Sequence, residues 1–314
     1  MTIGIFPAAG GLGGSTYKHL LKLVPADQVV LISRNPDKVP QEYAQAGAVL
    51  RQASYESSPE ELAKAFDGVK TLFLISYPSH VHKYRVKVQI PAVDAARRAG
   101  VKHIFYSSLG FASLKKSSSL AEVMQAHLDT ERYLAKLASE DESFTYTSIR
   151  EGIYSESTPI YTAFFTPENA SHKKEILIPH DGSGPGVTWV KQDELGEASA
   201  RLIADYVAET QKFEYVNDIV TLTGIREWSL ADTVHLLAKT LGKEVRIRQV
   251  SVDEYVAQPQ VLEKFGSREN AVTWATAWDA IRAGETAVVT PDMEKILGRK
   301  PEAFETTIGN ILGR

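Results

Sequence analysis

Residues 3–16, IGIFPAAGGLGGST, join a short apolar run to a glycine-rich turn and the start of a helical segment. Gly10 and Gly13 fall where a strand passes into a helix. Their missing Cβ atoms let a ligand approach the backbone, and the first N–H groups of the helix attract an anion. The usual dinucleotide fingerprint begins with a further glycine, where this chain has Pro7, so we expect the first turn to differ somewhat. The stretch predicts a pyrophosphate site; the alternative is a turn that binds nothing.

Short apolar runs alternate with longer amphipathic segments over the first half of the chain. Runs rich in Val, Ile, Phe and Tyr predict strands at 3–6, 29–33, 48–51, 71–75, 103–107 and 145–149. Helices are expected between them, near residues 12–24, 58–66, 82–99 and 119–138. Strands separated by helices need crossover connections, so we predict an α/β fold with a Rossmann-like, doubly wound parallel sheet.

The pattern becomes less regular after Gly152, where prolines and a glycine loop at 182–186 interrupt short segments. Helices are predicted at 192–207 and 229–241, and a strand at 245–250. Ser251 and Glu254 have the spacing of a capping box. We therefore expect a dinucleotide-binding Rossmann-like domain at 1–152 and a smaller, mainly substrate-binding α+β domain at 153–314. Segments near 187–223 are expected to return to the first domain.

The composition excludes several classes of function. The chain has 314 residues, no cysteine and a net charge of −4, so thiolate chemistry is excluded and no overall basic field favours nucleic acid. No apolar run approaches the roughly 18 residues that span a bilayer, and the N-terminus lacks the pattern of a signal peptide. We expect a cytoplasmic protein that binds a small-molecule substrate, without nucleic-acid or membrane partners, as a monomer or homodimer.

The end of the second predicted strand indicates which dinucleotide is bound. A site selective for NAD usually places an acidic side chain there for the ribose hydroxyls. This chain has Ser33, Arg34 and Asn35 instead, with Lys38 close by. A guanidinium can form two hydrogen bonds to a 2′-phosphate, and Lys38 can add a second charge. The sequence therefore favours NADP(H), the alternative being a solvated arginine in a turn.

With these residues placed, the chain resembles the NmrA-like family of atypical short-chain dehydrogenases/reductases, especially its quinone-oxidoreductase-like and fungal branches. The segments that carry the resemblance are PAAGGLG (7–13), SRNP (33–36), AFDGVKTLFLIS (65–76), AGVKHIFYSS (99–108), HLDTE (127–131) and REGIYSE (150–156). Their order and spacing are more specific than any one of them. The resemblance implies a Rossmann-like domain that binds NADP(H) and a smaller C-terminal substrate domain.

The resemblance also implies a set of cofactor-binding residues, carried over by position. These are Gly10, Leu12, Gly13, Arg34, Ser54, Tyr55, Ile75 and Ser76. Many relatives have an acidic residue where this chain has Ser54, so the contact on the adenine side is expected to differ.

The usual catalytic pair of short-chain dehydrogenases is missing. Ordinary members use Tyr-x-x-x-Lys on the helix after the fifth strand, where the lysine lowers the pKa of the tyrosine. Val123 stands at the tyrosine position and His127 at the lysine position, as in the quinone-reductase-like branch. His127 and Glu131 lie one helical turn apart and can form a hydrogen bond. His127 is therefore predicted to hold the nicotinamide ribose or to donate a proton; the alternative is a structural histidine.

Other polar side chains are candidates near the expected nicotinamide. They are Tyr106, Ser107, Ser108, Glu122 and Tyr154. Glu122 can act as an acid or base if a cleft buries it, and Tyr154 as a pocket wall or proton donor. His80 and His82 lack further ligands nearby in sequence, so no metal site is predicted. Trp274 and Trp278, one helical turn apart, are expected to mark a buried face of a helix.

Three functions are compatible with these residues. The first is an NADPH-dependent oxidoreductase that reduces a small conjugated carbonyl, imine or quinone-like substrate, because such acceptors delocalise the product charge. The second is a redox-neutral isomerase or rearrangement enzyme of fungal secondary metabolism, in which Glu122, His127 or Tyr154 moves protons while the cofactor is not consumed. The third is a regulatory protein that senses NADP(H).

Overall fold

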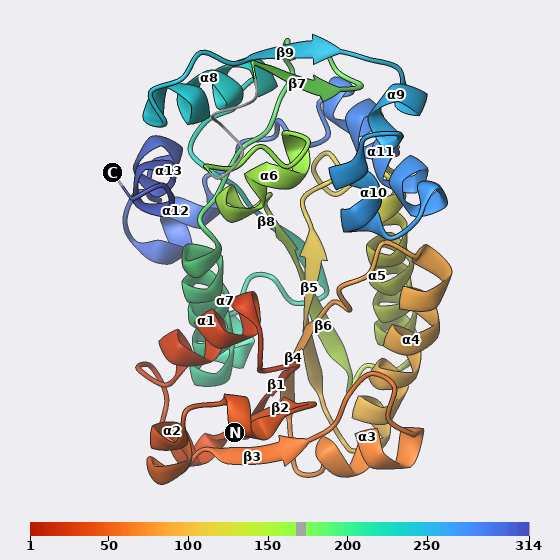
Figure 1. The fold of residues 1–314 in the computed structure, drawn as a ribbon. Coiled ribbons are helices and arrows are strands. Elements are labelled where there is room, and N and C mark those ends of the chain that lie inside the picture. Colours follow the sequence, from red (N-terminus) through yellow and green to blue (C-terminus); the bar gives the residue numbers. More distant parts are fainter. Residues whose placement is uncertain (168–173, 314) are drawn as a thin grey trace.

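The computed structural model describes residues 1–167 and 174–313 and contains a seven-stranded parallel sheet. The strand order is β3-β2-β1-β4-β5-β6-β8, so the direction of winding reverses between β1 and β4 (Figure 1). The strands are β1 (Ile3–Phe6), β2 (Val29–Ser33), β3 (Val49–Gln52), β4 (Thr71–Ile75), β5 (His103–Leu109), β6 (Thr145–Glu151) and β8 (Asp218–Leu222). The predicted doubly wound α/β fold is confirmed, and the six predicted strands agree with β1 to β6 within two residues.

Helices cover both faces of this sheet. On one face α1 (Gly11–Leu20) packs against α7 (Gln192–Ala208). Gly196 allows the close approach, since a Cβ there would overlap the side chain of Ser15. On the other face α3 (Pro59–Ala65), α4 (His82–Arg98) and α5 (Glu122–Glu140) pack in sequence order. The two layers lie on opposite sides of the strands in Figure 1.

The strands bury side chains on both faces, as parallel strands between two helical layers must. Ile3 and Ile5 of β1 point into the cluster under α1 and α7, whereas Phe6 packs on Tyr55 and Phe66 in the cluster under α3 and α4. This alternation places the end of β1 against both layers. The turn that follows β1 is thereby held at the centre of the molecule.

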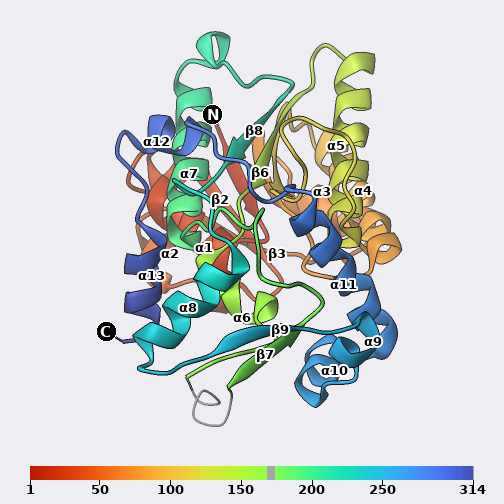
Figure 2. The ribbon, with the colours of Figure 1, turned by 90° about the horizontal axis from the view of Figure 1, so that it is seen from above.

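The C-terminal part adds a second, two-stranded sheet and further helices (Figure 2). β7 (Glu175–Ile178) pairs in parallel with β9 (Arg246–Gln249). Helices of this part are α6 (Thr158–Tyr161), α8 (Leu230–Thr240), α9 (Val252–Val256), α10 (Pro259–Phe265), α11 (Arg268–Arg282), α12 (Asp292–Leu297) and α13 (Phe304–Ile311). The predicted capping box of Ser251 and Glu254 is present. The sequence analysis did not predict β7 or β8; β8 lies in the main sheet, beside β6.

An aromatic core holds the C-terminal helices together. Trp274 and Trp278 of α11 are both buried, as their spacing predicted. Tyr161 of α6 contacts both indoles, and Phe111, after β5, stacks on Tyr161. The C-terminal part is thus attached to the sheet at the carboxyl end of β5. Among residues 1–167 and 174–313, no helix is long and apolar enough to cross a membrane.

His103, at the start of β5, makes the fold sensitive to acid. Its ring stacks on Tyr206 with centroids 3.9 Å apart and hydrogen-bonds Thr145 and Thr147. Burial lowers the pKa of His103 to about 3, against about 6.5 in an unfolded chain. Between these values the unfolded chain binds a proton that the folded protein does not, so stability falls as the pH falls. The contribution approaches about 1.4 kcal/mol per pH unit.

We therefore expect His103→Gln to have a shallower loss of unfolding free energy between pH 6 and pH 4 than the wild type. The measurement is urea unfolding at a series of pH values. His235→Gln, which removes an exposed histidine, is the matched control and should leave the slope unchanged. Equal slopes in the wild type and His103→Gln would contradict the prediction.

Candidate functional site

Two adjoining cavities lie at the carboxyl ends of the central strands, where the winding reverses. The β1–β2 cavity has a volume of about 420 Å³ and is lined by Phe6, Pro7, Ala9, Gly10, Ser33, Arg34, Asn35, Lys38, Ala53, Ser54, Tyr55, Glu56, Tyr77 and Pro78. The β4–β5 cavity has a volume of about 360 Å³ and begins at the same Tyr77 and Pro78. A switch point of this kind is where open α/β sheets bind their ligands.

The turn after β1 presents its backbone to the β1–β2 cavity. Gly10 has a φ of 137° and precedes α1, and no atom lies within 4 Å of the place where its Cβ would be. At Gly13 a Cβ would overlap the carbonyl oxygen of Pro7, so the helix can pack this close to the strand only with glycine. Leu12 buries its side chain in the core, while its N–H belongs to the first turn of the helix. The turn therefore has the open backbone and N–H groups that an anionic ligand needs.

The side chains of the same cavity fit a phosphorylated ligand. Arg34 and Lys38 line it, are exposed, and form no ion pair with any described residue. The hydroxyl of Ser33 is buried and has no hydrogen-bond partner in the described chain. The side chains of Arg34 and Lys38 and the hydroxyl of Ser33 can therefore donate hydrogen bonds to a bound anion.

Ser54 and Tyr55 lie on the far wall of the β1–β2 cavity, where the sequence analysis expected them. The Tyr55 hydroxyl donates to the carbonyl oxygen of Ile75 at 2.6 Å. The Ser54 hydroxyl accepts from the N–H of Glu56 at 3.2 Å. Tyr55 is thus a fixed wall between this cavity and the end of β4.

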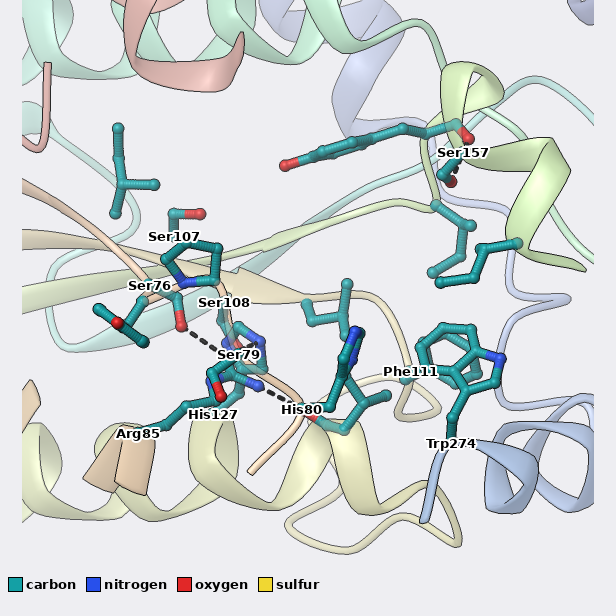
Figure 3. Close-up of a pocket in the computed structure, with 18 of the residues that line it drawn as sticks. Ser76, Ser79, His80, Arg85, Ser107, Ser108, Phe111, His127, Ser157 and Trp274 are labelled. Carbon is teal, nitrogen blue, oxygen red and sulfur yellow. Dashed lines mark hydrogen bonds between the residues drawn. The ribbon is translucent and has the colours of Figure 1, made fainter. Parts of the chain in front are cut away.

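The β4–β5 cavity has a polar end and an aromatic end (Figure 3). Ser76, Ser107, Ser108, Arg85 and His127 gather at the polar end, and Phe111 and Trp274 lie at the other. The ring of His80 stands between the two groups in Figure 3. Further lining residues are Ile75, Tyr77, Pro78, Ser79, Leu109, Val123, Gly152, Ile153, Tyr154, Ser157, Ile160 and Tyr161. The shape suits a ligand with one polar edge and one apolar face.

His127 belongs to a buried hydrogen-bond network. Arg85 Nη2 lies 2.6 Å from His127 Nε2, and the Tyr106 hydroxyl lies 3.2 Å from Nδ1. Because a guanidinium only donates, Nε2 accepts and the neutral ring carries its proton on Nδ1, toward Tyr106. Burial, Arg85 and Arg150 hold the pKa of His127 well below its usual value. His127 is therefore a neutral, fully engaged histidine rather than one with a proton free for the cavity.

The expected hydrogen bond between His127 and Glu131 is not formed, which corrects the sequence analysis. Glu131 instead binds Arg150, with Nε–Oε1 at 3.0 Å and Nη2–Oε2 at 2.7 Å, and accepts from the Ser108 hydroxyl at 2.6 Å. The spacing of one helical turn would allow His127 and Glu131 to form a hydrogen bond. The fully buried guanidinium of Arg150 takes the carboxylate because a buried cation needs a counter-charge.

Glu122 does not reach the cavity, which corrects its candidacy as an acid or base. It is exposed at the first turn of α5, where its N–H donates to the Thr276 hydroxyl at 2.9 Å. Tyr154 does line the cavity and is half-buried. Burial, followed by the charges of Glu151 and Glu156, raises its pKa, so Tyr154 keeps its proton at neutral pH.

The two neighbouring histidines have separate environments. His82 Nε2 pairs with Asp129 Oδ2 at 2.6 Å, whereas His80 packs edge-on against Phe265 and Trp274. Within the described chain no three His, Asp or Glu side chains are grouped as metal ligands.

Sequence reasoning missed Arg85, Trp274 and Tyr161, which line the β4–β5 cavity, and Gln89, which is fully buried and does not line it. Arg85 and Gln89 lie one turn apart on α4, and both reach Ser76: Arg85 Nη2 donates to its hydroxyl at 2.5 Å, and that hydroxyl donates to Gln89 Oε1 at 2.6 Å. The only feature of the sequence that indicated Arg85 and Gln89 was that both are polar residues on the buried face of a helix. Trp274 and Tyr161 were hidden among ordinary core aromatics.

The fold and the two cavities define a Rossmann-like α/β protein with a ligand site at its switch point. The chain belongs to the NmrA-like family, whose pattern it matches over residues 1–283. It is 32% identical over 297 residues to an NmrA-like family domain-containing oxidoreductase of Aspergillus flavus, covering 94% of this chain and 89% of the relative. It is also 32% identical over 255 residues to quinone oxidoreductase 2 of Escherichia coli, covering 81% and 80%.

Solved structures of similar proteins share the whole fold. The NADPH-dependent quinone oxidoreductase of Escherichia coli, complexed with NADPH, is 27% identical with a TM-score of 0.80 and 99% coverage of both chains. The Citrobacter triphenylmethane reductase, complexed with NADP(H), is 27% identical with a TM-score of 0.77 and the same coverage.

Proposed function

We propose that this protein binds NADP(H) along the two cavities. The observation that carries the proposal is a pair of cations, Arg34 and Lys38, that have no ion-pair partner among residues 1–167 and 174–313 and lie beside the glycine turn of Gly10 and Gly13. The turn would hold the pyrophosphate, and the cations would hold the 2′-phosphate. Ser54 and Tyr55 would flank the adenosine, and Ile75 and Ser76 would lie at the nicotinamide. The similar structures that contain NADP(H) support this assignment.

The proposed activity is NADPH-dependent reduction of a small conjugated carbonyl, imine or quinone-like substrate. When bound, reduced nicotinamide supplies a hydride. The aromatic end of the β4–β5 cavity, with Trp274, Tyr161 and Phe111, would hold the apolar face of the acceptor and exclude water. Oxidoreductases among the relatives support this class of reaction.

The chain's own residues would then position the acceptor and supply the proton. Tyr154 remains the candidate donor because it lines the cavity, although burial and the charges of Glu151 and Glu156 raise its pKa and make it a weaker acid. His127 would act as a positioning residue, since both of its nitrogens are engaged. In this proposal residues 1–152 bind the cofactor, with 187–223 returning to them, and residues 153–314 mainly shape the substrate cavity.

The test is oxidation of NADPH by the purified protein with a panel of quinones and conjugated carbonyl compounds, followed at the nicotinamide absorbance. We expect turnover with planar aromatic quinones and much slower turnover with NADH. If a substrate is converted while NADPH is unchanged, the redox-neutral isomerase is favoured instead. If NADPH binds but nothing in the panel is converted, the oxidoreductase proposal is contradicted and a sensing role gains support.

A further inference from the structure

Arg85 is a buried cation in the wall of the β4–β5 cavity. It is 3% exposed, and its guanidinium donates to the Val123 carbonyl at 2.8 Å, to the Ser76 hydroxyl and to His127. No carboxylate of the described residues pairs with it, and its Nε is buried without a hydrogen-bond partner. Its charge is therefore hydrogen-bonded but not neutralised.

The groups around Arg85 do not supply the missing negative charge. His127 from α5 is held neutral, and the pKa values of Tyr106 from β5 and Tyr55 beyond β3 are raised by burial. His80 is a histidine whose pKa is lowered by burial and then by Arg85.

The buried carboxylate that contacts the cavity wall, through the Ser108 hydroxyl, belongs to another cation. Glu131 is tied to Arg150, which is also buried. Glu131 thus neutralises Arg150, and Arg85 in the cavity wall has no ion-pair partner among the described residues. Burial of such a charge is costly unless a counter-charge is present.

We propose that Arg85 makes the polar end of the β4–β5 cavity a binding site for an aryl or enol oxyanion. The inference rests on the proposed function in one respect only, that this cavity holds the acceptor. The ligand class is an aromatic or conjugated molecule whose oxygen carries, or comes to carry, a negative charge. Its ring would lie toward Trp274 and its oxygen toward Ser76 and Arg85.

The positive charge of Arg85 would replace that of the lysine in the usual Tyr-x-x-x-Lys pair, where this chain has His127. Addition of a hydride from NADPH to a quinone forms one bond to hydrogen, oxidises NADPH to NADP⁺ and leaves the hydroquinone monoanion. One proton, from the candidate donor Tyr154 or from water, then completes the hydroquinone. At the usual lysine position stands the neutral His127, and Arg85 reaches the same place from α4. A fixed, buried cation beside the new oxyanion would stabilise it.

The test is a pH titration of 4-nitrophenol bound to the full-length protein, with and without NADP⁺, followed at the absorbance of the phenolate. We expect the bound phenol to have a lower pKa than the free phenol. In Arg85→Gln the bound ratio of phenolate to phenol at a given pH should fall about tenfold or more, which is one pKa unit. Arg85→Lys, which keeps the charge, should retain most of the effect.

Lys87→Gln is the matched control, since it removes an exposed charge from the same helix and should change nothing. The titration of the wild-type protein tests the proposal even if Arg85→Gln does not fold. The proposal is overturned if the wild type does not bind the phenol. It is also overturned if the pKa of the bound phenol is equal to or above that of the free phenol. An equal bound pKa in wild type and a folded Arg85→Gln also overturns it. Because no turnover is needed, a protein that oxidises no NADPH but lowers the pKa of the bound phenol would contradict only the proposed function.

Discussion

Replacement of both Arg34 and Lys38 by alanine is expected to weaken NADPH binding by about 100-fold or more. Both side chains line the β1–β2 cavity and neither has an ion-pair partner in the described chain, so their charges are available to a 2′-phosphate. A hydrogen bond to a charged group contributes about 1.5–3 kcal/mol, and each 1.4 kcal/mol is a factor of ten. NADH, which has no 2′-phosphate, should lose no more than a few-fold.

Dissociation constants for NADPH and NADH, measured by calorimetry at fixed ionic strength, check this expectation. The control is the double variant Arg132→Ala, Lys136→Ala, which removes two exposed charges from α5 and preserves the net charge of the test variant. Equal losses for NADPH and NADH would mean that the two cations act on the nucleotide in general. No loss for NADPH would contradict the assignment of the 2′-phosphate site.

The sequence predicted the main sheet well because most of its strands, unlike the edge strand β3, are buried on both faces. Runs such as 29–32 and 72–75 are continuously apolar and are separated by clear helical segments. β7 and β8 carry weaker signals: β7 buries only every second side chain, and β8 follows Asn217, which has a φ of 55°. Their places depend on pairing with β9 and β6, which are distant in sequence and leave no local pattern.

The predicted cofactor turn lies at the cavity because its chemistry is local. Glycines, the following helix and Arg34 occupy one continuous region of chain, so spacing alone brings them together. The polar end of the β4–β5 cavity is different, since Arg85, Tyr106 and His127 come from three separate elements. Spacing on one helix suggested the partner Glu131 for His127, and only the three-dimensional packing shows that Arg150 takes it.

Loss of the Glu131 charge is expected to lower the free energy of unfolding by about 3–5 kcal/mol, the usual result of leaving one partner of a buried ion pair. Arg150 is 0% exposed and Glu131 7%, so water cannot replace the carboxylate in Glu131→Gln. Replacement of the pair together, as Glu131→Leu with Arg150→Met, removes both charges and should cost clearly less than Glu131→Gln.

Urea unfolding of the single and double variants measures this coupling. Glu140→Gln, at the exposed end of the same helix where the carboxylate lies 3.8 Å from Lys136, is the matched control and should change stability little, because solvent screens that pair. If Glu131→Gln were no less stable than Glu140→Gln, Arg150 would have another source of neutralisation. If the double variant were the least stable, the two residues would contribute mainly through packing and the Ser108 hydrogen bond rather than through their charges.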